Sequence, residues 1–282
     1  MRSSKFFFVV GLTLLAVLGL LIGSCSDDKT TTANSTSIIH SQFDETQEQV
    51  NAFVDSTLSV FNTCLNIIDI GNDASSDTTT TLVLYSAVDP DSVVVSDEWY
   101  LVYVSDVDLS AGYSNVMLDS IRFLQNGTFQ DSPKNADALN IRHNWDFENL
   151  DTTLSYSNYS NNGDITLYDV DMDTTTVTGT TTLQVTSKKV NEMYTERSDF
   201  DIQLTISNLK VENIDGDCNF GCPYSGTITV AVDLTYQIDD DEADISSWEF
   251  VLTFENGLAS VIVTQGTRQT DYTCDFCDFN QQ

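Results

Sequence analysis

The sequence is poor in positive charge, histidine and proline. It has 11 Lys and Arg against 43 Asp and Glu, with only two His and three Pro. A formal net charge of −32 repels phosphate backbones, which excludes nucleic acid as a partner. With 41% hydrophobic and 10% aromatic residues, the chain nevertheless has the composition of a folded protein rather than a disordered one.

Known catalytic motifs are also missing. The chain has no Gly-x-Ser-x-Gly, no His-Glu-x-x-His and no phosphate-binding loop. His40 falls in a polar segment, and His143 falls in an alternating stretch that predicts a surface position on a strand. We therefore assign no catalytic, cofactor-binding or metal-binding residue, and we expect neither a cofactor nor enzymatic activity.

Two acidic runs are candidate calcium loops. They are Asp169–Asp173 and Asp239–Glu242, and neither has the glycine and closing glutamate of an EF-hand. We interpret both as solvated loops. Because the chain has 43 carboxylates, an enzyme that acts on glycans through an unmarked acidic pair remains an alternative.

The amino terminus has the pattern of a secretory signal over residues 1–24. Arg2 and Lys5 precede an apolar run over 6–21, and Ile22-Gly23-Ser24-Cys25 follows it. The run is near the lower limit for a membrane span, and small residues come directly after it. The sequence Ile22-Gly23-Ser24-Cys25 resembles the lipobox of bacterial lipoproteins. The resemblance implies a diacylglyceryl thioether on Cys25, cleavage before it and acylation of the new amino terminus. The alternative is a transmembrane anchor with an incidental cysteine.

Residues 25–43 are rich in Ser and Thr and predict a flexible, lipidated tether. Ser26-Asp27-Asp28 resembles the acidic tether of surface-exported Bacteroidota lipoproteins. It implies a place in the outer membrane, at the cell surface, with the periplasmic face as the alternative. Without Arg2 and Lys5 the formal charge is −34, which repels anionic head groups, so the lipid on Cys25 is the expected membrane contact.

Residues 44–282 predict a single β-rich domain that begins with a helix over 44–70. Its apolar residues recur at spacings of three and four, which places them on one face of a helix about 40 Å long. These residues are Val50, Phe53, Val54, Leu58, Phe61, Leu65 and Ile68.

Beyond the helix the apolar period changes to two, which predicts strands. Turn signals at Asn126-Gly127, Asn162-Gly163 and Asn256-Gly257 favour hairpins. Without long crossovers the sheet should be a curved antiparallel meander, as an open barrel or a sandwich, with the helix packed on it. The expected strands are Leu82–Val88, Ser92–Val104, Asn115–Gln125, Leu139–Phe147, Thr153–Tyr159, Ile165–Val170, Thr175–Thr186, Asp199–Val211, Thr227–Ile238, Ser246–Glu255 and Leu258–Thr270.

Several aromatic residues on these strands fit either a core or a sugar-stacking face. Trp99 and Tyr100 are neighbours, so on a strand they must point to opposite faces. The core interpretation is favoured because aromatic residues are good strand formers. The full set is Trp99, Tyr100, Tyr103, Tyr156, Tyr159 and Trp248.

Four late cysteines predict disulfides, which are the default outside the inner membrane. If Leu258–Thr270 is one strand, Cys222 and Cys274 lie at opposite ends of a sheet roughly 40 Å across. A disulfide needs Cα atoms within about 7 Å. We therefore predict local pairs, Cys218 with Cys222 and Cys274 with Cys277. The alternative for Cys274 and Cys277 is a pair of free thiols, because Cys-x2-Cys bridges are tight and often redox-active. Cys64, beside the apolar helix face, is expected to be a buried thiol.

Taken together, these patterns predict a lipid-anchored surface lipoprotein with a non-enzymatic binding or envelope role. Its ligand could be a glycan, a lipid or a protein. An alternative is a carrier of an apolar ligand, because a long helix on a curved antiparallel sheet is similar in architecture to periplasmic lipid carriers such as the lipoprotein localisation factors.

Overall fold

The computed structural model describes residues 43–44, 46–54, 57–58, 92–130, 136–150, 155–214 and 219–275. The predicted signal peptide, the tether with Cys25 and the strand expected at Leu82–Val88 lie outside these residues, apart from the last residue of the tether. The side chains of Cys64, Cys218, Cys222 and Cys277 also lie outside the description.

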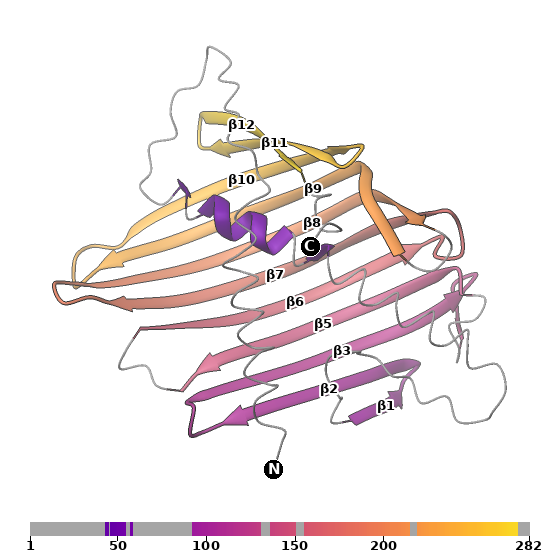
Figure 1. Ribbon diagram of the computed structural model, residues 1–282, viewed down its shortest axis with the longest axis horizontal. Coiled ribbons are helices and arrows are strands. Elements are labelled where there is room, and N and C mark those ends of the chain that lie inside the picture. Colours follow the sequence, from indigo (N-terminus) through magenta and orange to yellow (C-terminus); the bar gives the residue numbers. More distant parts are fainter. Residues whose placement is uncertain are drawn as a thin grey trace.

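The described strands form one antiparallel sheet (Figure 1). Eleven strands follow one another as neighbours in chain order, and β4 pairs with β3 beside this path. The predicted antiparallel meander is therefore confirmed. The sheet is open, so it is neither a closed barrel nor a two-sheet sandwich. The strands are β1 (Ser92–Ser96), β2 (Trp99–Asp108), β3 (Tyr113–Gln125), β4 (Thr128–Gln130), β5 (Ala138–Asn149), β6 (Tyr156–Tyr168), β7 (Thr174–Val190), β8 (Thr195–Ile214), β9 (Asn219–Ile238), β10 (Asp244–Glu255), β11 (Leu258–Gln265) and β12 (Arg268–Asp275).

The two faces of the sheet differ because side chains alternate along each strand. We call the buried one the inner face. It carries the apolar core, in which Phe123 and Phe250 are fully buried. The other, outer face carries Thr, Ser, Asn, Asp and Arg at the intervening positions, which are partly or fully exposed. The period-two pattern of the sequence thus corresponds to one face in the core and one face in solvent.

A short helix at residues 46–54 belongs to the core, and residues 43–44 and 57–58 are also helical. Val50, Phe53 and Val54 are at most 3% exposed and pack in the same cluster as the sheet. Figure 1 shows the helix lying in front of the middle of the sheet. The expected helix extends to residue 70, but 59–70 lie outside the described residues, so its length of about 40 Å stays a prediction.

Tyr272 joins the helix to β12. Its hydroxyl donates a 3.1 Å hydrogen bond to Asn51 Oδ1. Burial of the ring raises the pKa of Tyr272 above its usual range, so the hydroxyl stays protonated and a donor at neutral pH. The hydrogen bond thus joins β12 to the helix.

Two of the three predicted asparagine–glycine turns are confirmed. Asn126-Gly127 joins β3 to β4 and Asn256-Gly257 joins β10 to β11, with positive φ at all four residues. Asn162-Gly163 is wrong as a turn, because it lies within the continuous strand β6. There Asn162 pairs with Thr182 and Gly163 with Thr181 of the longer strand β7, so pairing with β7 overrides the local turn preference.

Two hairpins were missed inside expected single strands. Asp97 and Glu98, both at positive φ, turn the chain between β1 and β2. Gly266, at φ +59, lies in the turn between β11 and β12, so Leu258–Thr270 is not one strand. β12 therefore runs back along β11 and places Cys274 opposite Ala259, beside the β10–β11 turn.

This return changes the geometry of the cysteines. Pro223, next to Cys222, accepts a 2.9 Å hydrogen bond from the backbone N–H of Gly257 in the same β10–β11 turn. Cys222 and Cys274 therefore lie at the same end of the sheet, and the premise that a full strand length separates them is wrong. Cys274 is 1% exposed and belongs to a disulfide bond. Its partner is not among the residues whose side chains are described, so the local pairing stays a prediction.

Two glycines allow a bulge in the long central strands. The pairing of β8 shifts against β7 between Val177 and Gly179, and against β9 between Ser207 and Lys210. Gly179 and Gly226 have φ of +155° and +113°, and their backbones press against neighbouring strands. Such close approach requires residues without a Cβ.

Candidate binding site

Two arginines converge on one tryptophan on the outer face. We call Arg122 of β3 and Arg142 of β5 the arginine pair. Their guanidinium carbons lie 4.6 and 4.3 Å from the ring centroid of Trp99, which begins β2. These distances are in the range of cation–π contacts. Both arginines alternate with buried Ile121 and Ile141, which fixes them on the outer face.

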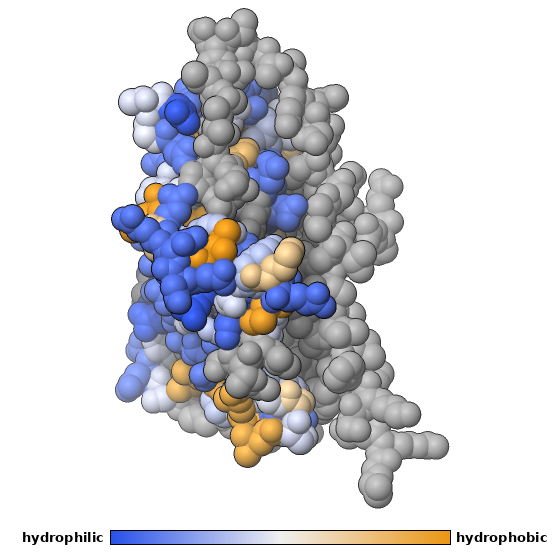
Figure 2. Space-filling model, turned by 90° about the vertical axis from the view of Figure 1, so that its left-hand side faces the viewer, coloured by the Kyte–Doolittle hydropathy of each residue, from blue (hydrophilic) through white to orange (hydrophobic). Residues whose placement is uncertain are grey.

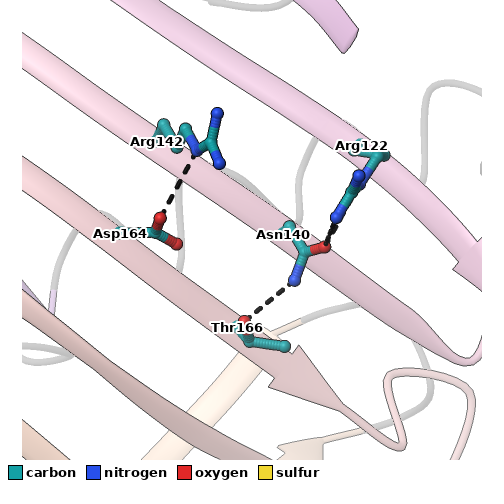
Figure 3. A network of polar contacts seen from close by, with 5 residues as sticks. All are labelled: Arg122, Asn140, Arg142, Asp164 and Thr166. Atoms are coloured by element: carbon teal, nitrogen blue, oxygen red, sulfur yellow. Dashed lines mark hydrogen bonds and ion pairs between the residues drawn. The ribbon is translucent and has the colours of Figure 1, made fainter. Parts of the chain in front are cut away.

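A line of hydrogen bonds orients Arg122 across three strands (Figure 3). Its Nη2 donates a 2.8 Å hydrogen bond to Asn140 Oδ1, and Asn140 Nδ2 donates a 2.8 Å hydrogen bond to Thr166 Oγ1. Asn140 is thus fixed as an acceptor toward β3 and a donor toward β6. Among the described residues, the partner that accepts hydrogen bonds from the guanidinium of Arg122 is this neutral amide.

Arg142 has a carboxylate partner, but the pair is loose. Its Nε lies 3.4 Å from Asp164 Oδ2, and the two side chains are 57% and 61% exposed. An exposed ion pair of this kind contributes little, typically up to about 1 kcal/mol, because water and salt screen it. Asp164 can therefore be displaced from Arg142 at low cost.

A shallow hollow lies beside the arginine pair. Next to it, Tyr103 is 38% exposed and pairs across the strands with Leu118, which is 39% exposed. On the far side, Asn144 Nδ2 donates a 2.7 Å hydrogen bond to Asn162 Oδ1. The outward side chains that line the hollow are Leu118, Ser120, Arg142, Asn144, Asn162, Asp164 and Thr180. The hollow thus combines apolar, amide, hydroxyl and cationic groups.

The predicted aromatic residues are divided between the two faces. Trp99 and Tyr100 point to opposite faces, as expected: Tyr100 is 9% exposed in the core, whereas Trp99 contacts the arginine pair. Trp248 is also confirmed as a core residue, and Tyr159 packs against the core and stacks on Trp145. Only Tyr103 of this set is an exposed ring beside the hollow.

His143 is not the surface position that the sequence predicts. Its side chain is 16% exposed on the inner face, and its Nδ1 lies 2.6 Å from Asp119 Oδ1 on β3. The two residues are direct cross-strand partners. Such a carboxylate orients a histidine ring as in hydrolase triads, but among the described contacts no Ser, Thr or Cys reaches the other ring nitrogen. The pair is a part-buried polar contact between β3 and β5.

Further polar and aromatic groups line the inner face near His143. Trp145 Nε1 donates a 2.6 Å hydrogen bond to Asn115 Oδ1. Tyr113 stacks on Phe147 with 6.0 Å between centroids and donates a 2.9 Å hydrogen bond to Asp106. Burial and this carboxylate raise the pKa of Tyr113 to about 12. These contacts stabilise the less apolar end of the inner face.

The two acidic runs are structural turns in the described chain. Asp239 Oδ1 accepts a 2.6 Å hydrogen bond from the Thr195 backbone N–H, so this carboxylate joins the end of β9 to the start of β8. Val170, the second residue of the first run, is only 6% exposed. Within the described ranges, no three His, Cys, Asp or Glu side chains are grouped as they would be around a metal ion.

Figure 2 looks at the end of the sheet that carries the β2–β3, β7–β8 and β9–β10 turns, where hydrophilic residues surround separate hydrophobic patches. The most exposed apolar side chains here are Leu109, Met193 and Ile245. Scattered residues of this kind are common on soluble surfaces. None of the described helical residues forms a helix long and apolar enough to span a membrane.

Comparison with known proteins finds no relative of this chain. No protein-family model, curated protein or solved structure matches this chain. Function must therefore be inferred from the chemistry of the site itself.

Proposed function

We propose that this protein is a lipid-anchored lipoprotein of the outer membrane, displayed at the cell surface, that binds a polysaccharide without enzymatic activity. The difference between the two faces of the sheet carries this proposal. The inner face is filled by the core, whereas the outer face presents Tyr103 and the arginine pair beside a hollow with amide and hydroxyl groups. Sugar rings bind to such surfaces through apolar C–H faces and through hydroxyls that pair with amides and charges.

The anchor is the lipid on Cys25, because the acidic chain would not adhere to an anionic membrane surface. We expect that Cys25→Ser leaves an uncleaved or mislocalised precursor. Cell fractionation and immunoblotting would measure cleavage and membrane association, and protease added to intact cells would test surface display. A Cys25→Ser protein that still matured and fractionated with the outer membrane would contradict the anchor.

The carrier alternative would need an open apolar inner face. The side chains of β8, β9 and β10 that face the core are almost entirely buried. For example, Ile202, Val230 and Phe250 are 0% exposed. This packing favours a binding role for the outer face instead. The enzyme alternative has only the Asp119–His143 pair to support it among the described residues, and the side chain of Asp119 is 5% exposed and that of His143 16%.

Tyr103 provides a direct test of the outer face. We expect Tyr103→Ala to weaken polysaccharide binding by roughly fivefold, because the loss of an aromatic stacking contact costs about 1 kcal/mol. Tyr194→Ala is the matched control, since Tyr194 is also 38% exposed but lies at the β7–β8 turn. Binding of the full-length chain, purified in detergent, would be measured on immobilised polysaccharides. Equal losses in both variants would contradict the assignment of the outer face.

A further inference from the structure

The arginine pair is unusual in a protein with so few cations. Without Arg2 and Lys5, the chain has nine Lys and Arg against 43 Asp and Glu. Two of these nine nevertheless contact the same tryptophan ring. Like charges held together repel one another, so the close approach of the two guanidinium groups has an electrostatic cost that a bound anion would remove.

The positive charge of the arginine pair is only partly balanced by the carboxylates of the described residues. Arg142 pairs with Asp164 at 3.4 Å, and Arg122 donates its described hydrogen bonds to the amide of Asn140. Two guanidinium groups thus share one carboxylate among the described residues, which leaves a local positive charge on a strongly acidic molecule. Guanidinium groups bind carboxylate and sulfate groups in a two-point geometry.

We infer that the arginine pair binds the anionic group of an acidic polysaccharide, either a carboxylate or a sulfate. This inference rests on the proposed polysaccharide-binding function and adds the class of ligand. Trp99 and Asn140 hold the two guanidinium groups in place, so little side-chain freedom is lost on binding. Asp164 acts as a weak internal counter-ion that the anionic group of the ligand displaces from Arg142. The hollow beside Arg142 receives the rest of the sugar ring.

Charge complementarity also explains how an acidic protein can hold an acidic ligand. The net charge repels a polyanion at long range, but salt screens this repulsion over about 8 Å at physiological ionic strength. At short range, the arginine pair attracts the anionic group of the ligand. Acidic polysaccharide should therefore bind best at intermediate salt concentration and weaken again at high salt.

The test uses the full-length chain with three probes: polygalacturonate for carboxylate, dextran sulfate for sulfate and neutral dextran. We expect at least one polyanion to bind at least tenfold more tightly than neutral dextran. Arg142→Gln and Arg122→Gln should each weaken binding of that polyanion about tenfold, as expected for loss of a charge-assisted contact. Asp164→Asn should tighten it severalfold, because the internal competitor is removed.

Arg197→Gln is the matched control, because Arg197 is an exposed arginine on β8 outside the arginine pair, and it should leave binding unchanged. Thermal unfolding of each variant would show that the fold is retained. If neutral dextran binds as well as both polyanions and the Arg122 and Arg142 variants behave as wild type, the charge inference is wrong while polysaccharide binding stands. If none of the three probes binds, both the inference and the proposed function are contradicted.

Discussion

Gly226→Ala is expected to lower the free energy of unfolding by about 3 kcal/mol or more. The φ of Gly226 is +113°, where residues with a Cβ are strained. A Cβ built there would lie 2.5 Å from Leu209 Cα and 2.6 Å from Asn208 O. Both neighbours are backbone atoms of the β8 bulge, so relief requires β8 and β9 to separate. Urea unfolding followed by circular dichroism would measure the loss.

Gly127→Ala is the matched control for backbone strain alone. Gly127 also has positive φ, at +75°, but no atom lies within 4 Å of the Cβ that would be added. We expect a cost of only about 1–2 kcal/mol, the typical penalty for an L-residue in the left-handed region. If the two substitutions cost the same, close packing of β9 against the bulge would not be the reason for Gly226.

Phe53→Ala is expected to cost about 3–5 kcal/mol, as for a large aromatic side chain removed from a full core position. Phe53 is 3% exposed and lies in the same cluster as Val50, Val54 and the inner face of the sheet. Removal of the ring leaves a cavity between the helix and the strands. The midpoint and slope of urea unfolding would give the change in free energy.

Glu48→Ala on the exposed side of the same helix provides the control, with an expected change within about 0.5 kcal/mol. A cost below about 1 kcal/mol for Phe53→Ala would mean that the helix can leave the sheet without loss of core packing. That result would favour a removable lid and would revive the carrier alternative over an outer-face binding role.

Much of the fold could be predicted because alternation along a strand is a local property. Strands such as Asn115–Gln125 and Ser246–Glu255 lie within or close to the observed β3 and β10. The errors arose where a local signal competed with pairing to neighbouring strands. Thr153–Tyr159 and Ile165–Val170 fuse into β6, because β6 pairs along its whole length with β7. Conversely, the turn at Gly266 had no asparagine or proline to mark it.

The candidate site could not be predicted to the same extent, because it depends on register between strands. That Trp99 and Tyr100 face opposite sides follows from the sequence alone. Arg122 and Arg142 are twenty residues apart, and the sequence does not show that they face the same tryptophan. This becomes clear only from the register of the strands, in which Ser120 pairs with Arg142 and Tyr100 pairs with Ile121. The contact between Asp119 and His143 was missed for the same reason, since both residues look ordinary in their own strands.

The lengths of the strands bear on how the molecule avoids assembling with itself. An edge strand of an open sheet presents unpaired backbone N–H and C=O groups. Another chain can pair with them, which is a route to fibrous aggregation. Among the described strands, β1 and β12 lie at the two ends of the strand order and have 5 and 8 residues, whereas β8 and β9, in the interior, have 20 each. The described part of the sheet thus becomes narrower toward both edges, and its edge strands are short templates for pairing with another chain. This taper gives an open sheet part of the protection that barrel closure gives other β proteins.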